Sequence, residues 1–600
     1  MMLTLAIAGL LFNSFQATAI WPKLFHISTG SDEVWLSHDV EITYQRSFGW
    51  QTIAEKVPFA AQLPLLFVFS GQILFTNDWV KLNRNISSEE FLTFAIERFK
   101  TGVFDQNFVP RKFYPSGWRF KPATDRKIVI EKIAINKVSK IKQLDSIVNA
   151  TFLDEAYRIH ISASGECNVQ VHSDKGALHA LGTLSQLFYA DPESPGLVYT
   201  NVAPLEILDY PVFQHRGLNL DISRNQIYPE DVMRVIDGMS FNKLNKLHLH
   251  ATDAQSWPLE VKAYPELAIQ GAYEEAQIWT VSKVDVVQYY GMLRGVDVFL
   301  EIDMPGHTTS ISKAFPSLIT AAGMEDWQKY ALEPPSGQLK LNSTEVHKFL
   351  ETMLNDLLPR SRTYSSLFHI GGDELNRNAY GRDPTVNSTS KAVLRPLVQS
   401  FVDKVLKIAV KHGLTPVIWE EMLLDWNLTL PRNTLIQTWR STEALSKVLS
   451  SGHRAIFGSN SHWYLDCGFG TFLDPTEPSE PREDPTLKPP FLDYCTPYKN
   501  WRHVYSYDPL KDIPLSQHYL IVGGEVHLWG ELTDSVTLDG MLWPRAAAAA
   551  EVLWSGGGDL PTEDTTRRLA EMRERLLRRK IAAGMVQMEW CLRNKGGCTI

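Results

Sequence analysis

After Pro211 the chain alternates short apolar runs with helical segments, which is the pattern of parallel βα units. Runs with the length and composition of buried strands begin at His215, Lys243, Val296, Ser366, Thr415, Asn433, His453 and His518. Eight such strands close a (β/α)8 TIM barrel, whose active site forms at the carboxyl ends of the strands. Each run ends in acidic, aromatic, His or Arg residues. The pattern therefore predicts an α/β fold with a catalytic barrel over residues 206–555.

The segments on either side of the barrel follow other patterns. Runs at 127–135 and 157–163 predict strands, and the apolar spacing over 174–189 predicts a helix, so we expect a smaller α+β domain at residues 20–205. Residues 556–600 contain an amphipathic helix and a cysteine-closed tail. We expect its charged residues to be solvated and its apolar face to consist of Leu569, Met572, Leu576 and Leu577.

The first 19 residues have the features of a secretory signal peptide. An apolar run from Leu3 to Phe12 precedes Ala17-Thr18-Ala19, a small-x-small cleavage pattern, and the run is too short to span a bilayer. A buried N-terminal strand is the alternative. Secretion, or vacuolar or cell-wall association, also fits the N-x-[ST] sequons at Asn85, Asn149, Asn342, Asn387 and Asn427. The apolar stretch 58–75 is interrupted by polar residues and a proline, which favours a buried strand pair over a membrane anchor.

The five cysteines suit an oxidising compartment. Cys591 and Cys598 can close a short loop and Cys467 and Cys495 a longer one, which leaves Cys167 free and buried. The sequence contains no CxxC metal spacing.

Charge and aromatic content narrow the choice of partner. Lys and Arg number 59 against 68 Asp and Glu, a net charge of −9, which argues against a nucleic acid or an anionic membrane surface. The 17 Trp and 20 Tyr supply flat faces that, beside carboxylates, suit a sugar site.

The segment HIGGDELN places Asp373 and Glu374 side by side where a strand leaves the sheet, after two glycines that let the backbone approach a ligand closely. Neighbouring carboxylates cannot act as the opposed acid and nucleophile of an ordinary retaining glycosidase, which lie about 5 to 5.5 Å apart across the anomeric carbon. Taken alone, the pair could also be a solvated strand end or a set of metal ligands.

Seven motifs occur in a fixed order on successive predicted strands: HRGLNLDISRN, HLHATDAQSWP, EIDMPGH, HIGGDELN, VIWEE, WYLD and VHLWGE. With them the chain resembles a family 20 glycoside hydrolase of the fungal β-N-acetylhexosaminidase type. The resemblance implies an exo-acting enzyme that releases terminal N-acetylglucosamine or N-acetylgalactosamine from chitooligosaccharides and glycoconjugates. It implies a retaining, substrate-assisted mechanism through an oxazolinium intermediate. It also implies a homodimer and no metal or other cofactor.

The resemblance also implies residue roles. Glu374 would be the acid/base, Asp373 would hold the acetamido N–H, and Tyr464 would donate its hydroxyl to the acetamido oxygen. The implied substrate-binding set is Arg216, Asp466 and Glu531 for the sugar hydroxyls, Trp419, Trp439 and Trp529 for the pocket walls, and Asp253 and His307 in line behind the acid/base. One of His248 and His250 is expected to face the barrel interior, and neither is assigned a catalytic role.

The chain departs from the family pattern at two places. Tyr494 stands where fungal relatives usually have Trp, and Ala331 and Ser336 stand where many carry a further cysteine pair. A secreted sugar-binding protein that has lost its chemistry is an alternative, opposed by the intact Asp373, Glu374 and Tyr464. A disaccharide-releasing relative is another alternative, opposed by Asp466 and Glu531, which would close the non-reducing end.

Overall fold

A computed structural model describes residues 19–46, 49–52, 86–115, 118, 128–141, 144, 150–194, 196–474 and 485–600. The predicted signal peptide, the stretch 58–75 and the sequons at Asn85 and Asn149 lie outside these residues, apart from Ala19. The other three sequon asparagines, Asn342, Asn387 and Asn427, are exposed. Among the described residues, no helix combines the length and the apolar character that crossing a membrane requires.

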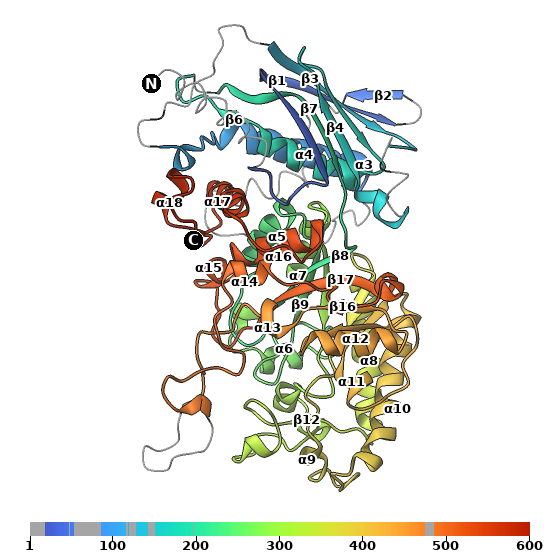
Figure 1. The fold of residues 1–600 in the computed structure, drawn as a ribbon. Coiled ribbons are helices and arrows are strands. Elements are labelled where there is room, and N and C mark those ends of the chain that lie inside the picture. The colour runs from blue at the N-terminus through green and yellow to red at the C-terminus, as the bar shows by residue number, and fades with distance from the viewer. Residues whose placement is uncertain are drawn as a thin grey trace.

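The eight predicted strands form a closed parallel barrel (Figure 1). They are β8 (His215–Asp221), β9 (Lys246–His250), β10 (Asp297–Glu301), β13 (Leu367–His369), β14 (Thr415–Trp419), β15 (Leu435–Thr438), β16 (Ala455–Phe457) and β17 (Ile521–Leu528). Pairing of β17 with β8 closes the ring, so the last predicted strand lies beside the first. The predicted barrel fold is confirmed.

Helices surround the barrel, and most of them have one apolar stripe to bury. They include α5 (Pro229–Phe241), α7 (Val281–Met292), α8 (Thr344–Ser361), α10 (Lys391–Lys411), α12 (Thr442–Ser450) and α16 (Arg545–Ser555). In α8 the Ser343 hydroxyl accepts a hydrogen bond from the backbone N–H of Val346, which caps the helix start. Val346, Leu350 and Leu354 then recur at helical spacing and are buried.

The N-terminal segment forms a seven-stranded sheet in the order β2-β1-β3-β5-β4-β7-β6. Its strands are β1 (His26–Arg46), β2 (Gly49–Thr52), β3 (Ile128–Lys137), β4 (Tyr157–Ile161), β5 (Cys167–Val171), β6 (Tyr189–Ala190) and β7 (Val198–Asp209). Helices α3 (Ser88–Lys100) and α4 (Asp174–Leu187) pack together beside this sheet, as Figure 1 shows. The predicted α+β architecture is present, with strands and a helix where the sequence patterns place them.

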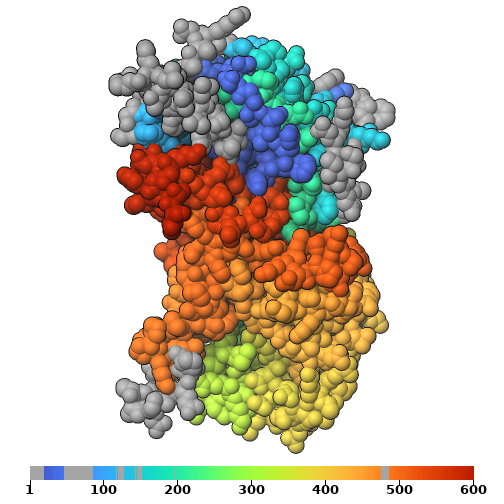
Figure 2. All heavy atoms as spheres, in the orientation of Figure 1, coloured from blue at the N-terminus to red at the C-terminus, as the bar shows by residue number. Residues whose placement is uncertain are grey.

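Helix α17 (Glu563–Arg578) lies between the two domains, and Figure 2 shows the C-terminal segment in red filling the space between them. The expectation that its charges are solvated is wrong for several of them. Arg568 donates to both carboxylate oxygens of Glu551, at 2.6 and 2.9 Å, and Arg575 donates to Glu571 at 2.9 Å. All four side chains are buried, because ion pairs and carbonyl oxygens replace the water that each charge would otherwise need.

The first described residues reach the same junction. The indole of Trp21 donates to the carbonyl oxygen of Ala547 at 3.1 Å, and the backbone N–H of Lys23 donates to Glu551 at 2.7 Å. Trp21 is fully buried. The start of the described chain is therefore fixed to helix α16 of the barrel.

Candidate active site

Asp373 and Glu374 follow β13 at the carboxyl end of the barrel, and Gly371 decides how the strand leaves the sheet. Gly371 has φ +70°, and a Cβ atom there would lie 1.7 Å from Asp303 Oδ1. The N–H of Gly372 donates to the same oxygen at 2.9 Å. The space beside Gly371, which the sequence suggested for a ligand, is thus filled by the Asp303 carboxyl group.

The carboxyl group of Asp303, which is buried, and that of Asp373, which is partly buried, lie close together. Burial raises the pKa of Asp303 to about 6. Burial and the neighbouring Asp303 raise the pKa of Asp373 well above its usual range. Two carboxyl groups this close cannot both ionise cheaply, which favours the retention of a proton between them.

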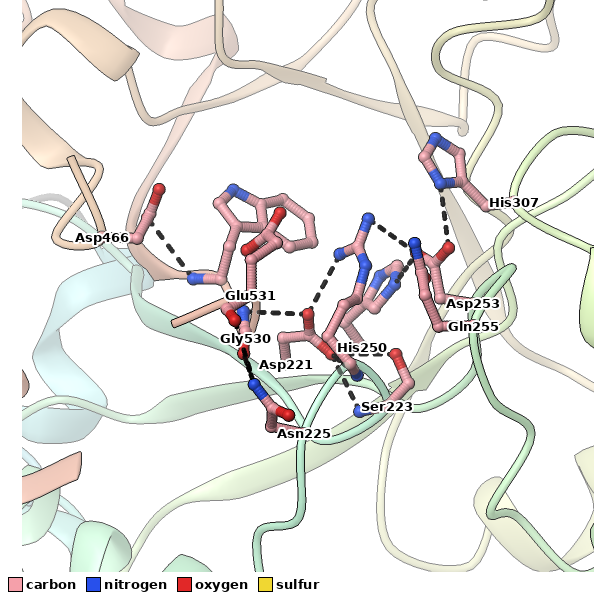
Figure 3. A network of polar contacts seen from close by, with 12 residues as sticks. Asp221, Ser223, Asn225, His250, Asp253, Gln255, His307, Asp466, Gly530 and Glu531 are labelled. Carbon is pink, nitrogen blue, oxygen red and sulfur yellow. Dashed lines mark hydrogen bonds and ion pairs between the residues drawn. The ribbon is translucent and has the colours of Figure 1, made fainter. Parts of the chain in front are cut away.

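Glu374 faces a different partner. Its Oε2 atom lies 3.4 Å from Nε2 of His307, and His307 Nδ1 donates to Asp253 Oδ1 at 3.1 Å (Figure 3). Although burial opposes the charged form, Asp253, Asp303 and Asp373 hold the pKa of His307 well above its usual range. The structure therefore brings Asp253, His307 and Glu374 together in the predicted order, with an imidazolium beside Glu374.

Both His307 and Glu374 have φ +51°, in the left-handed region that residues other than glycine rarely occupy. Such strain is retained where the surrounding contacts hold it, and it is frequent at functional sites. Here it marks the two residues that face each other.

The four predicted aromatic side chains gather into one cluster beside these carboxyl groups. Trp419 ends β14, Trp439 follows β15 and Trp529 follows β17. The ring of Tyr464 stacks on Trp439 at 6.0 Å between centroids and lies 6.2 Å from Trp529, which in turn lies 6.2 Å from Trp419. Burial raises the pKa of Tyr464 well above its usual range, so its hydroxyl keeps its proton and can donate it in a hydrogen bond.

Two further predicted carboxylates lie at the opposite side of the site. Asp466 accepts a hydrogen bond from the backbone N–H of Trp529 at 3.4 Å, and Glu531 lies close by (Figure 3). Burial raises the pKa of Asp466 to about 6 and that of Glu531 well above its usual range. Uncharged or partly charged carboxyl groups of this kind can both donate to and accept from sugar hydroxyls.

Arg216 is not part of this site, which corrects the prediction from sequence. It is fully buried near the start of β8, at the other end of the barrel. Its guanidinium donates to both carboxylate oxygens of Glu155, at 3.0 and 2.5 Å, and to the carbonyl oxygens of Lys243 and Phe213. Its ion pair with Glu155 therefore joins the barrel to the N-terminal domain, and its bonds to the two carbonyl oxygens lie within the barrel.

Arg224 is the arginine that the sequence reasoning missed. It lies just beyond the carboxyl end of β8, 5.3 Å above the ring of Trp529. It is ion-paired with Asp221 at 3.0 Å and with Asp253 at 2.9 Å. Its position beyond the end of the strand, rather than near its start, was the available signal, because the active end of a parallel barrel is the carboxyl end.

Disulfides and hydrogen bonds tether several loops of the chain. The predicted disulfides Cys467–Cys495 and Cys591–Cys598 are both present, and Cys167 is a buried free thiol. Tyr494, beside the first bridge, is 65% exposed. Ser336, at one of the positions where a further cysteine was expected, donates its hydroxyl to the carbonyl oxygen of Ala321 at 2.8 Å. That loop keeps a tether without a disulfide.

Three side chains of the site are close enough to ligate a metal ion, but they also take part in ion pairs. Ligand atoms of Asp303, His307 and Asp373 lie within 4.8 Å of one another. The raised pKa of His307 works against ligation, because a ligating imidazole must give up the proton on its coordinating nitrogen.

Comparisons with known proteins agree with this geometry. Residues 213–557 match the model of "Glycosyl hydrolase family 20, catalytic domain", and residues 20–187 match "beta-acetyl hexosaminidase like". The chain is 43% identical over 619 residues to a "Beta-hexosaminidase" of Arthroderma benhamiae, with all of both chains covered. It is 30% identical to a "Chitooligosaccharidolytic beta-N-acetylglucosaminidase" of Bombyx mori, over 86% of this chain and 85% of that one.

Among solved structures, the fold is similar to that of the exo β-N-acetylglucosaminidase of Vibrio harveyi in complex with N-acetylglucosamine. The TM-score is 0.68 at 20% identity, and the match covers 95% of this chain and 79% of that chain.

Proposed function

The chain belongs to glycosyl hydrolase family 20 and is an exo-acting β-N-acetylhexosaminidase, and we propose that Glu374 is its acid/base. In the first step the acetamido oxygen of the substrate attacks the anomeric carbon as the glycosidic bond breaks. Glu374 gives its proton to the leaving oxygen, and the sugar becomes an oxazolinium ion. In the second step Glu374 takes a proton from water as that water opens the ring, which restores both the acetamido group and the acid.

Asp373 and Tyr464 act on the acetamido group in this proposal. Asp373 accepts the acetamido N–H and stabilises the positive charge of the ring, while Tyr464 donates its hydroxyl to the attacking oxygen. The observation that carries the assignment is that two carboxyl groups adjacent in sequence have different partners. Asp373 is paired with Asp303, whereas Glu374 faces His307 at 3.4 Å. One residue is thereby suited to the nucleophile's side of the sugar and the other to the leaving group.

The remaining residues bind the sugar. Trp419, Trp439 and Trp529 are proposed to wall the pocket against the acetamido methyl and the apolar sugar face. Asp466 and Glu531 are proposed to bind the 4- and 6-hydroxyls. Arg224 takes the role first given to Arg216, because it lies at the same end of the barrel as they do.

Tyr494 lies at the edge of the site, within electrostatic reach of Asp466, Glu531 and Glu374. Its exposed ring is suited to contact the leaving sugar. A smaller aromatic surface than the Trp of fungal relatives offers less stacking area, so we expect weaker binding of that sugar.

The substrates proposed are chitooligosaccharides and glycoconjugates that end in β-linked N-acetylglucosamine or N-acetylgalactosamine. The name of the Bombyx mori relative supports the first class. Secretion is supported by two disulfides and three exposed sequons. A homodimer and the division into domains at 20–205, 206–555 and 556–600 belong to the same proposal.

The test is hydrolysis of aryl β-N-acetylglucosaminide, β-N-acetylgalactosaminide and β-glucoside by purified protein. We expect turnover of the first two and almost none of the third, since the plain glucoside lacks the nucleophile. A cyclic thiazoline mimic of the intermediate should bind far more tightly than substrate. Glu374→Gln should abolish turnover of substrates with poor leaving groups and spare more activity on activated aryl glycosides. Rapid hydrolysis of the glucoside, or a sugar ester trapped on an Asp or Glu, would refute the mechanism.

A further inference from the structure

Glu301, the last residue of β10, is a fully buried carboxylate that contacts side chains of three other strands. Its Oε1 atom accepts the indole N–H of Trp419 at 2.8 Å and lies 3.0 Å from His369 Nδ1. Its Oε2 atom accepts from His250 Nδ1 at 2.6 Å and lies 3.0 Å from His248 Nε2. One side chain thus links β9, β13 and β14 inside the barrel.

From Glu301 a continuous path of polar contacts leads to the acid/base. His250 Nε2 donates to Asp253 Oδ2 at 2.8 Å, beside the contact of Asp253 with His307 that Figure 3 shows. His307 in turn faces Glu374. Both ring nitrogens of His250 point at carboxylates, and an imidazole can donate from both only when it is protonated.

The other oxygen of Glu301 leads to the acetamido side of the pocket. Trp419 is 1% exposed, and its only polar atom outside the backbone, Nε1, is held by Glu301. A hydrogen bond at that atom fixes the plane of the indole, because the ring can otherwise turn about its two side-chain torsions.

We propose that Glu301 is a positioning residue with two effects. It fixes the orientation of Trp419, and it keeps His250 donating hydrogen bonds from both ring nitrogens. It would thereby hold the acetamido pocket and the acid/base in one arrangement. The inference rests on the proposed function, and Glu301 itself does not touch the substrate. Hydrogen-bond partners behind metal-ligating side chains typically change activity about 10- to 100-fold when they are removed, and we expect an effect of similar size here.

Several other charged groups face the same path and enter any test that varies pH. They are Asp221 and Arg224 from the end of β8, Asp303 and Glu333 from segments after β10, Asp373 after β13, and Glu525 and His527 from β17. One of them, Glu525, provides a matched control for the substitution of Glu301.

Glu525 is a second fully buried carboxylate in the same barrel interior. Its partners are His215 at 2.6 Å, His248 at 3.1 Å and Gln437 at 2.8 Å. It shares His248 with Glu301 but is bonded to neither Trp419 nor His250 in the described contacts. Glu525→Gln therefore removes a comparable charge without cutting either path.

The experiment compares Glu301→Gln with Glu525→Gln in the full-length protein. An amide cannot accept from both Trp419 and His250 through two carboxylate oxygens, so Glu301→Gln should lower kcat/KM about 10- to 100-fold. It should also weaken thiazoline binding and move the alkaline limb of the pH profile. Glu525→Gln should leave thiazoline affinity and the pH profile in place. Equal effects of the two variants on all three readouts would overturn the proposal.

A second pair of variants keeps the proposal testable if Glu301→Gln fails to fold. Trp419→Phe removes the indole N–H that Glu301 accepts, together with part of the ring. His250→Asn removes the imidazole that joins Glu301 to Asp253. Because both changes act through one carboxylate, their combined effect on kcat/KM should depart from the product of the single effects by about fivefold or more. Independent, multiplicative effects would count against Glu301 as the link.

The same measurements separate this inference from the proposed function. If wild type fails to hydrolyse the aryl N-acetylhexosaminides, or if Glu374→Gln retains activity on poor leaving groups, the proposed function is wrong. If those controls hold and Glu301→Gln still behaves as Glu525→Gln does, only the positioning role is wrong.

Discussion

Replacing Arg216 with methionine should destabilise the protein without harming the chemistry. The change keeps most of the volume of the aliphatic stem and removes the guanidinium from a fully buried position. Glu155 then loses its bidentate partner and keeps a contact of 2.9 Å with His179. The carbonyl oxygens of Lys243 and Phe213 lose a donor each.

The expected size of the effect follows from those lost contacts. Breaking a buried ion pair by removing one partner costs about 3 to 5 kcal/mol, because the other charge stays in a poorly solvated place. Burial opposes ionisation of Glu155, yet Arg216 and His179 hold its pKa well below the usual range. A carboxylate with a depressed folded-state pKa stabilises the fold above its unfolded pKa, near 4.3, and loses that contribution as pH falls. The deficit of Arg216→Met should therefore be largest near neutrality and shrink towards pH 3.

The assay is urea unfolding followed by tryptophan fluorescence, together with kcat/KM at a temperature where both proteins are folded. The unfolding midpoint should fall while kcat/KM per folded molecule stays within about twofold of wild type. Arg224→Met is the control, because it lies beyond the other end of the same strand and should lower kcat/KM strongly. Normal stability with lost activity in Arg216→Met would refute the placement of Arg216 outside the site.

Three further predictions concern the site and its loops. Asp373→Asn and Tyr464→Phe should each lower kcat about 10²- to 10³-fold with smaller changes in KM, measured by steady-state kinetics on aryl N-acetylglucosaminide; raised KM at normal kcat would contradict their roles. A carboxyl group with a raised folded-state pKa lowers the stability of the fold as pH rises from about 4 to 6. Asp303→Asn should therefore make stability depend less on pH in that range. An unchanged pH dependence of thermal unfolding would argue against the shared proton. Replacing Cys467 and Cys495 with alanine should lower the free energy of unfolding by roughly 3 kcal/mol, given their sequence separation of 28, and should reduce activity; full activity would separate the bridge from the pocket.

The sequence predicted the barrel well because strand spacing and strand ends are local signals. Each predicted strand ends in the residues that form the site, and the fixed order of motifs placed Asp373, Glu374 and Tyr464. The error at Arg216 arose because one arginine lies near the start of β8 and another follows its end, and a motif match does not say which one lies at the carboxyl end. Counting positions from the strand start would have favoured Arg224.

Other features depended on contacts between distant segments. The charges of Arg568 and Arg575 are typical of an exposed helix face. Only contacts with other segments bury them: Arg568 pairs with Glu551 of α16, whereas Glu571, the partner of Arg575, lies one turn away on α17 itself. The expectation that one of His248 and His250 faces the barrel interior is wrong, because both meet the carboxylate of Glu301 there. Residues two apart on a strand point to the same face. The periodicity of a sequence predicts which face of a helix or strand is polar. It does not predict which residues of other segments contact that face.

The contact of Trp21 with Ala547 has a consequence for the order in which the protein can be made. The two residues are 526 positions apart, and Glu551, which accepts the Lys23 N–H, is as distant. A ribosome releases the N-terminal sheet long before α16 and α17 exist, so the sheet must wait with this surface uncovered. Contacts between residues so far apart in sequence slow folding, and apolar surface stays exposed until they form. Nascent chains stalled before residue 545 should therefore depend on chaperones in a way that the completed protein does not.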